Sequence, residues 1–172
     1  VDKRQLAEDW PAARVKAVAT AQEEIGQSGG GARASDYQLE PDVAIVVDVT
    51  FSTDGPDVEK KELGEHRLGG GPVLSRGSAS YNSVFEMLAS VAEDEAIPYT
   101  IQASPRSTRT DADGIHLTRG GVPTGLISVP NRYMHSPNEV VSVDDLFHTA
   151  KLIAAFVPRL QVATDFQTRS GT

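Results

Sequence analysis

An unbroken run of five apolar residues, 43–47, lies within the segment DVAIVVDV at residues 42–49. A strand that is apolar at nearly every position is typical of a parallel sheet with both faces covered. Three further segments predict strands: GPVLSRG at 71–77, YTIQAS at 99–104 and PTGLISVP at 123–130. Residues 13–21 (ARVKAVATA) predict one more, because Val15, Ala17, Ala19 and Ala21 alternate with mixed positions.

Apolar residues recur at helical spacing between and after these strands. From 81 to 96, one helical face is predicted to carry Val84, Phe85, Leu88, Val91 and Ala92. A last helix is predicted from 142 to about 160, with a capping box formed by Ser142 and Asp145 and an inner face of Leu146, Ala150, Ile153 and Val157.

Shorter elements complete the pattern. Residues 2–9 resemble the end of a polar helix, 28–41 become helical after a glycine-rich start, and 110–119 predict a short helix ended by Gly120 and Gly121. Residues 52–71 are charged and glycine-rich, which predicts a long surface loop. Strands that alternate with helices predict an α/β fold with a mixed, mostly parallel sheet flanked by helices.

Composition narrows the class of function. The chain has 172 residues, enough for one domain with a hydrophobic core, and a net charge of −8 that argues against nucleic acid as a partner. No unbroken apolar run approaches the roughly 18–20 residues of a membrane span. Because cysteine is absent, any metal ligand must be His, Asp or Glu.

Four ionisable residues stand near the predicted ends of three strands: Glu23, Glu24, Asp48 and His135. In open α/β sheets, ligands bind beyond the carboxyl ends of the strands. A buried carboxylate such as Asp48 needs a cation or several donors, and a divalent metal meets that need. One glutamate of the pair would bind the metal, while its neighbour would act as a general base toward a water molecule.

Each of these residues also has an ordinary explanation. A Glu-Glu pair is commonly a solvated surface feature, an aspartate at a strand end caps a turn or helix, and a histidine before Ser-Pro lies in an exposed loop. Gly29, Gly30 and Gly31 lack the Lys-Ser/Thr of a phosphate-binding loop, so a flexible turn is the better interpretation. We interpret His66 as a loop residue and His116 and His148 as helix residues.

Five segments carry a family resemblance over residues 10–158: AQEEIG at 21–26, PDVAIVVDVTFSTD at 41–54, LGGGPVL at 68–74, TDA at 110–112 and GGVPTGLISVPNRYMHSPNEVV at 120–141. Together they resemble the co-catalytic metallopeptidases of the glutamyl aminopeptidase and tetrahedral aminopeptidase type. Some members of that family are described as cellulases or endoglucanases.

The resemblance implies a zinc-exopeptidase-like catalytic domain that removes N-terminal residues from peptides with two divalent metal ions, Zn²⁺ or Co²⁺. It makes Glu23 the general base, Glu24 and His135 ligands of one metal, and Asp48 a ligand of the second. Asp111 is either near the site or the N-cap of the short helix. The resemblance also implies peptide substrates, a homo-oligomer of the full-length protein and a cytoplasmic location.

Several parts of the family pattern are absent from this sequence. The family has an early His-x-Asp, an aspartate that bridges the two metals and an inserted β domain, and Arg109 stands where a glycine is expected. The chain also begins with Val1 rather than methionine. We therefore expect residues 1–160 to be the C-terminal portion of a metallopeptidase catalytic domain, followed by a frayed tail at 161–172.

Three functions remain open from the sequence. The first is a metal-dependent aminopeptidase whose 172-residue portion is inactive by itself, because it supplies too few ligands for two metals. The second is a glycoside hydrolase, which would need two carboxylates at a defined separation and no His-bound metal. The third is a non-catalytic remnant that serves as an interaction module.

Overall fold

The structure is a computed structural model, which describes residues 13–25, 30–56, 58–161, 164 and 166. The polar helix predicted at residues 2–9 lies outside these ranges. Within them, no helix combines the length and the apolar character that crossing a membrane requires.

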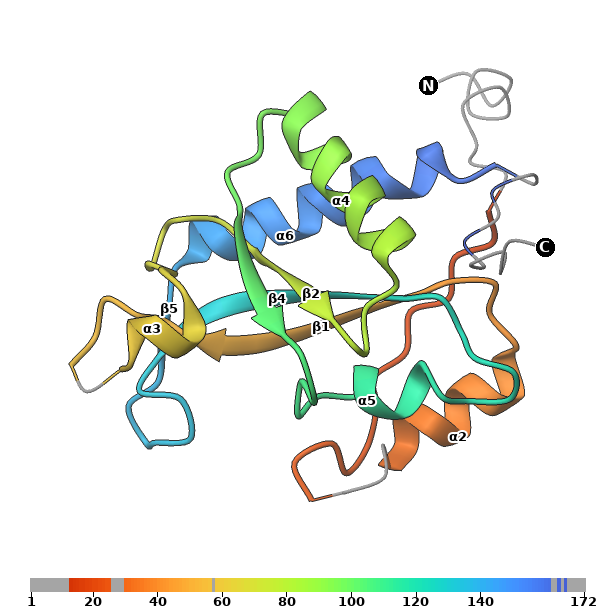
Figure 1. Cartoon of the computed structure of the whole chain (residues 1–172), viewed down its shortest axis with the longest axis horizontal. Coiled ribbons are helices and arrows are strands. Elements are labelled where there is room, and N and C mark those ends of the chain that lie inside the picture. Colours follow the sequence, from red (N-terminus) through yellow and green to blue (C-terminus); the bar gives the residue numbers. More distant parts are fainter. Residues whose placement is uncertain (1–12, 26–29, 57, 162–163, 165, 167–172) are drawn as a thin grey trace.

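A mixed sheet forms the centre of the molecule (Figure 1). Its strands are β1 (Ala44–Phe51), β2 (Val73–Gly77), β3 (Thr100–Ser104), β4 (Thr124–Arg132) and β5 (Val140–Val141). The order is β1-β4-β2-β3, with β5 beside β4. The longer pairings, β1 with β4 and β2 with β3, are parallel, whereas the short pairings of β4 with β2 and β5 are antiparallel. The predicted mixed, mostly parallel sheet is therefore confirmed.

Helices cover both faces of this sheet (Figure 1). The helices are α2 (Gly30–Leu39), α3 (Lys60–Leu63), α4 (Asn82–Asp94), α5 (Ala112–Ile115) and α6 (Val143–Phe156), followed by the 3₁₀ turn η1 (Val157–Arg159). Helices α4 and α6 pack on one face around Leu74, Leu88 and Ile127, and α5 packs on the other against Val46 and Leu126. The predicted face of α4 is confirmed, since all five of its apolar residues are buried.

Helix α6 faces the core with residues that differ in part from those predicted. Its buried positions are Asp145, Thr149, Leu152 and Phe156, whereas Leu146 and Ala150 are exposed. The prediction was wrong for Leu146 and Ala150 but right for Ile153, which is partly buried and packs against the core. Helix α6 has a second apolar arc, and periodicity does not say which arc is inside.

The predicted capping box of α6 is also wrong. Ser142 is the N-cap residue, but its side chain makes no capping hydrogen bond. The carboxylate of Asp145 instead accepts hydrogen bonds from the backbone amides of Gly69 and Gly71, at 2.8 and 2.7 Å. These two amides lie in the loop that precedes β2, so the acid ties that loop to the first turn of α6.

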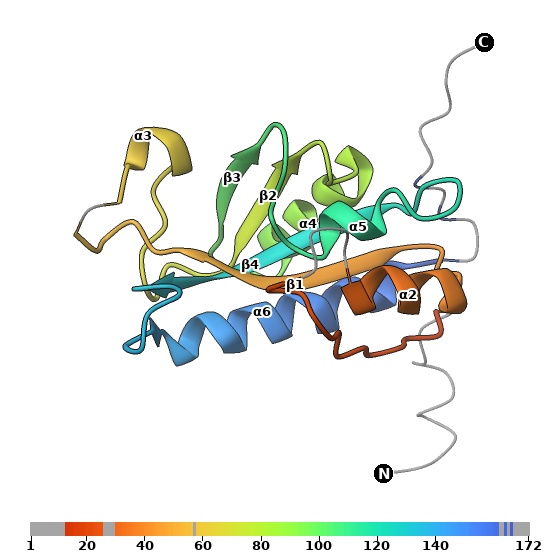
Figure 2. The same ribbon diagram turned by 90° about the horizontal axis from the view of Figure 1, so that it is seen from below.

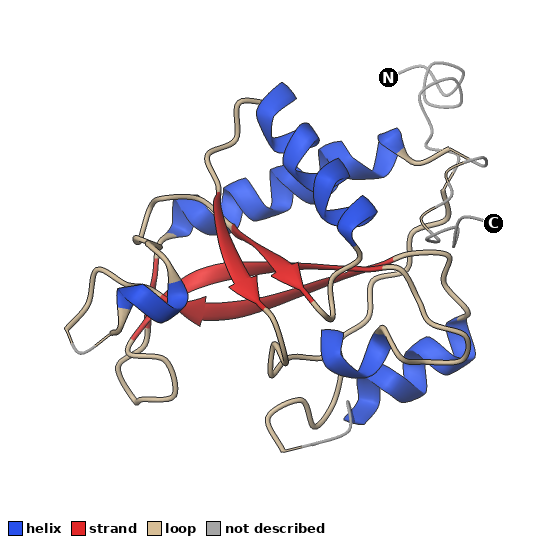
Figure 3. Cartoon of the chain, in the orientation of Figure 1, coloured by secondary structure: helices blue, strands red, loops and turns tan. Residues whose placement is uncertain are grey.

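The strand predicted at 13–21 does not form, and Figure 3 shows this segment as loop. Its side chains are mostly exposed, and it has no strand neighbour among the described residues. Alternating alanines do not make a strand without a ladder partner.

Strand β1 is only partly covered. Among the described strands it pairs with β4 alone, and Val47 on the α6 side is 51% exposed. The prediction of a strand covered on both faces was therefore wrong. An apolar composition shows that a strand can be buried, but it does not show which elements cover it.

Smaller differences concern the loops. Residues 52–71 contain helix α3 and the buried side chains of Thr53 and His66, so this segment is not a plain surface loop. The short helix predicted at 110–119 is confined to α5 and continues as turns. In the predicted tail, Phe166 is buried in the main core, and most of the other tail residues lie outside the described ranges.

Candidate active site

Asp48 lies within β1 rather than at its end, because β1 continues through Phe51. The carboxylate is half-buried on the face that carries Val46, and its Oδ1 accepts a hydrogen bond from the Val49 amide at 2.7 Å. Burial raises the pKa of Asp48, and the negative charges of Asp111 and Glu24 raise it further. The single hydrogen bond from Val49 therefore does not offset the burial and the neighbouring negative charges that disfavour the charged form of Asp48.

The glutamate pair lies in a turn rather than at a strand end. Residues 21–25 form bends and turns, and Gln22 takes a left-handed conformation with φ 63°. Burial raises the pKa of Glu23, as do the neighbouring charges of Asp48, Glu24 and Asp111. A carboxyl group with a raised pKa is better suited to accept and return a proton near neutral pH.

His135 follows β4 in a strained turn. Both Tyr133 and His135 are left-handed, with φ 61° and 64°, and the His135 amide donates to Glu139 Oε1 at 2.5 Å. At the start of the turn, Arg132 pairs with Asp54 at 2.8 Å. These contacts hold the imidazole beside Glu24, with 3.5 Å between His135 Nε2 and Glu24 Oε2.

Asp111 is a further carboxylate at this site. It occupies the N-cap position of α5 without making a side-chain cap bond, and its Oδ2 instead accepts a hydrogen bond from the Thr20 hydroxyl at 2.6 Å. Its charge acts on both Glu23 and Asp48. The sequence left open whether Asp111 caps α5 or lies near the site. The contacts of its side chain agree with a place near the site.

The structure therefore gathers the predicted residues without forming a closed metal cluster. Glu23, Glu24, Asp48 and His135 influence one another electrostatically, and Glu24 contacts His135. Within the described part of the chain, no three His, Asp or Glu side chains are close enough to bind a metal together. The donor set of carboxylates and imidazole suits Zn²⁺ or Co²⁺, and a cation would relieve the repulsion that raises the pKa of Asp48 and Glu23.

Sequence comparison identifies the family. The sequence profile of the M42 glutamyl aminopeptidases matches residues 3–152, which is most of the chain. The chain belongs to the M42 glutamyl aminopeptidase family. This result confirms the resemblance carried by the QEE, VDVT and RYMHSP segments.

Individual M42 relatives agree with this assignment. The chain is 38% identical over 158 residues to lysyl aminopeptidase from Pyrococcus furiosus, covering 92% of this chain and 44% of that protein. It superposes on the aminopeptidase APDkam598 from Desulfurococcus kamchatkensis with a TM-score of 0.73 and 41% identity, over 83% of this chain and 40% of that one.

A third similar protein is a peptidase that assembles into large particles. The TET1 peptidase of Pyrococcus horikoshii can form a tetrahedron or a large octahedral shell, and the chain matches it with a TM-score of 0.63 and 27% identity, over 82% of this chain and 40% of that one. The chain thus spans less than half the length of these relatives.

Two supporting contacts of this M42 site are absent from the sequence predictions. The Arg132–Asp54 pair connects the VDVTFSTD and RYMH segments, and the Thr20–Asp111 bond connects the glutamate segment to α5. Both aspartates lie in the segments that carried the resemblance, but only tertiary structure shows which residue each one contacts.

Proposed function

We propose that this chain carries part of the active site of a metal-dependent aminopeptidase, which removes N-terminal residues from peptides. The observation that carries the proposal is the contact of Glu24 with His135, beside the desolvated carboxyls of Glu23 and Asp48. Family membership supports the same reaction class.

In this proposal, Glu24 and His135 would hold one divalent cation, and Asp48 would be a ligand of a second. Such cations supply electrophilic assistance to the scissile carbonyl. Glu23, whose pKa is raised by burial and neighbouring charges, accepts a proton from the attacking water and returns it to the leaving amine. Its position next to Glu24 keeps the base close to the reacting carbonyl.

The chain by itself is expected to bind zinc weakly. Glu24, Asp48 and His135 are three ligands for two cations, whereas stable zinc sites provide three or four ligands each, as a rough guide. A non-catalytic interaction module would behave in the same way, so activity must be measured in a longer polypeptide.

The first prediction concerns the proposed base and ligands. In a polypeptide of the relatives' full length that includes this chain, Glu23→Gln should lower kcat on an aminoacyl chromogenic amide by about 10²–10⁴-fold, because proton transfer is lost. Glu24→Gln and Asp48→Asn should weaken zinc binding measured by calorimetry. Asp42→Asn, an exposed aspartate just before β1, is the matched control.

Two outcomes would contradict this proposal. Full turnover by the Glu23→Gln variant would exclude Glu23 as the base. Hydrolysis of cellulose fragments that persists in the presence of a chelator would instead indicate the glycoside hydrolase alternative, because that chemistry needs carboxylates and no His-bound metal.

A further inference from the structure

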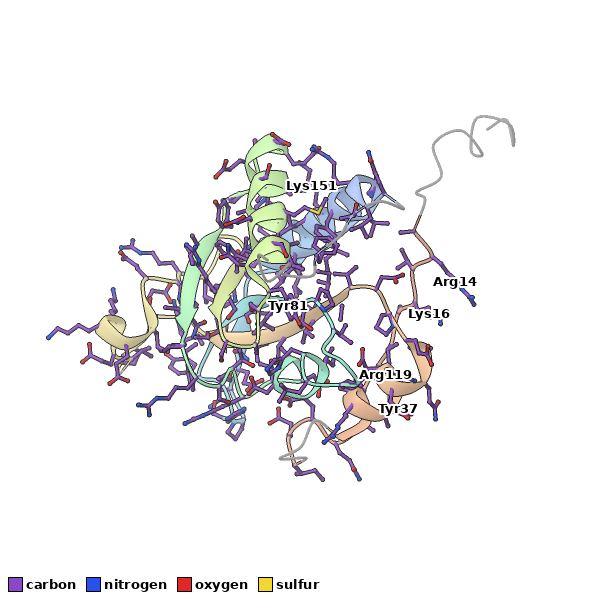
Figure 4. The ribbon with its side chains drawn as sticks, turned by 45° about the vertical axis from the view of Figure 1, so that its right-hand side comes forward. Arg14, Lys16, Tyr37, Tyr81, Arg119 and Lys151 are labelled. Carbon is purple, nitrogen blue, oxygen red and sulfur yellow. The ribbon has the colours of Figure 1, made fainter. Side chains whose placement is uncertain are left out.

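The segment that carries the two glutamates, residues 14–25, is held by few contacts. It forms no helix or strand, and most of its side chains are exposed. Figure 4 shows Lys16 on this segment, next to the end of α2, where its Nζ donates to the carbonyl of Leu39 at 3.5 Å. Such a segment does not fix two catalytic side chains by its own local structure.

Two contacts fix the segment immediately before the glutamates. The Thr20 hydroxyl donates to Asp111 Oδ2 at 2.6 Å, and the Gly31 amide donates to the Ala21 carbonyl at 2.9 Å. Both contacts lie within four residues of Glu24. They join the glutamate segment to the first turns of α5 and α2, which pack against each other on one face of the sheet.

The glycines at the start of α2 allow this close approach. A Cβ at Gly31 would lie 2.7 Å from the Ala21 nitrogen and 2.9 Å from the Ala21 oxygen. A Cβ at Gly30 would lie 2.9 Å from the Ala21 oxygen and 3.1 Å from the Gln22 oxygen, and Gly30 is left-handed with φ 34°. All these neighbours are backbone atoms, which cannot rotate away as a flexible side chain can.

We propose that Gly30, Gly31 and Asp111 are positioning residues, which seat the backbone at 20–22 and thereby set where Glu23 and Glu24 stand relative to His135. The assignment of Glu23 and Glu24 to catalysis rests on the proposed function. The placement of the backbone at 20–22 by these three residues rests on geometry alone. The glycine pair that resembles a flexible turn in the sequence thus has a steric role.

The second prediction tests this placement without using activity. Because the chain has no cysteine, Glu24→Cys with His135→Cys provides a unique thiol pair. A short bismaleimide should bridge the two thiols, since the native side chains meet at 3.5 Å. Adding Gly31→Ala should slow this crosslinking by about tenfold, because the new methyl group displaces the backbone at Ala21.

Gly120→Ala is the matched control, since a Cβ at Gly120 meets nothing within 4 Å. It should leave the crosslinking rate unchanged. Alanine is favoured over glycine inside a helix, so Gly31→Ala should retain the far-ultraviolet circular dichroism of the parent. If that variant does not fold, Thr20→Val removes the hydroxyl bond to Asp111 and should also slow crosslinking, whereas Thr20→Ser should restore the rate.

The outcomes separate this inference from the proposed function. Crosslinking of the Gly31→Ala and Gly120→Ala variants at the same rate would overturn the positioning role. In the full-length polypeptide, Gly31→Ala without the cysteines should lower kcat more than it raises KM, because the base is displaced. If the parent neither binds zinc nor hydrolyses peptides, the proposed function fails, but a slowed crosslink would still support the placement.

Discussion

His66 shows how one buried side chain makes stability depend on pH. Its ring lies between two hydrogen-bond partners. The Leu63 carbonyl is 2.7 Å from Nε2, and the Thr100 hydroxyl is 2.8 Å from Nδ1. A carbonyl only accepts, so Nε2 carries the proton, and the neutral ring can then accept from Thr100 at Nδ1. Burial lowers the pKa of His66 below its ordinary value of 6.5.

The third prediction follows from the sign of that shift. The unfolded chain binds a proton at His66 more readily than the folded chain, so the stabilisation is fully present above pH 6.5 and is lost as pH falls from 6.5 through the lowered pKa. The free energy of unfolding in urea should therefore decrease between about pH 7 and pH 5, and His66→Gln should make this decrease shallower. An unchanged slope in the variant would show that His66 makes no contribution.

Among the elements, α6 depends on a charged residue at its buried first turn. Asp145 is 0% exposed, and its two oxygens accept the amides of Gly69 and Gly71. A buried carboxylate is tolerated when donors surround it, and the same negative charge lies at the favourable end of the helix. Asp145 therefore fixes both the beginning of α6 and the loop before β2.

The fourth prediction compares two neighbouring acids of α6. Asp145→Asn should lower the free energy of unfolding by about 2–3 kcal/mol, because the new amide group faces a backbone donor and leaves it unsatisfied. Asp144→Asn is the control, since Asp144 is exposed in the same helical turn and makes none of these contacts. Equal losses in the two variants would indicate a helix-terminus effect rather than the two loop hydrogen bonds.

At the scale of the whole molecule, β1 is one of the two edge strands in the sheet order β1-β4-β2-β3. In Figure 2, α6 runs below β1 and α2 lies near one end of that strand. Phe147 of α6 is 69% exposed and Val47 of β1 is 51% exposed, and β1 has a partner on one edge only among the described strands. β1 is therefore an edge strand, and its outer backbone groups have no strand partner among the described residues.

The fifth prediction is that this edge exchanges amide hydrogens first. Peptides covering β1 should take up deuterium faster than peptides covering β4, which is paired with β1 on one edge and with β2 and β5 on the other. Mass spectrometry at several protein concentrations would measure both rates. Equal protection of β1 and β4 at low concentration would show that another polypeptide segment covers the edge in solution.

The sequence predicts most of the elements because the relevant patterns are local. Helix α4 has a single apolar arc, from Val84 to Ala92, so only one face can be buried. The strands β2, β3 and β4 likewise lie where short apolar runs end at glycine, proline or serine. The chemistry-bearing segments with QEE, VDVT and RYMH were also identifiable, because their residue types are informative without coordinates.

The remaining features depend on contacts between distant residues. Residues 13–21 alternate like a strand, but a strand also needs a neighbouring strand. Asp48 marks the end of an apolar run, yet β1 continues because Val49, Thr50 and Phe51 still pair with β4. The roles of Asp111 and Asp145 are set by Thr20 and by the glycines before β2, which no local pattern specifies.

The turn after β4 has a consequence for how this protein can change. Tyr133 and His135 are both left-handed, a conformation that costs about 1–3 kcal/mol for a residue other than glycine. Glycine at either position would relieve that cost, but at 135 it would also remove the imidazole. Selection for heat resistance alone would therefore favour glycine at position 135, at the expense of the imidazole that the proposed function requires.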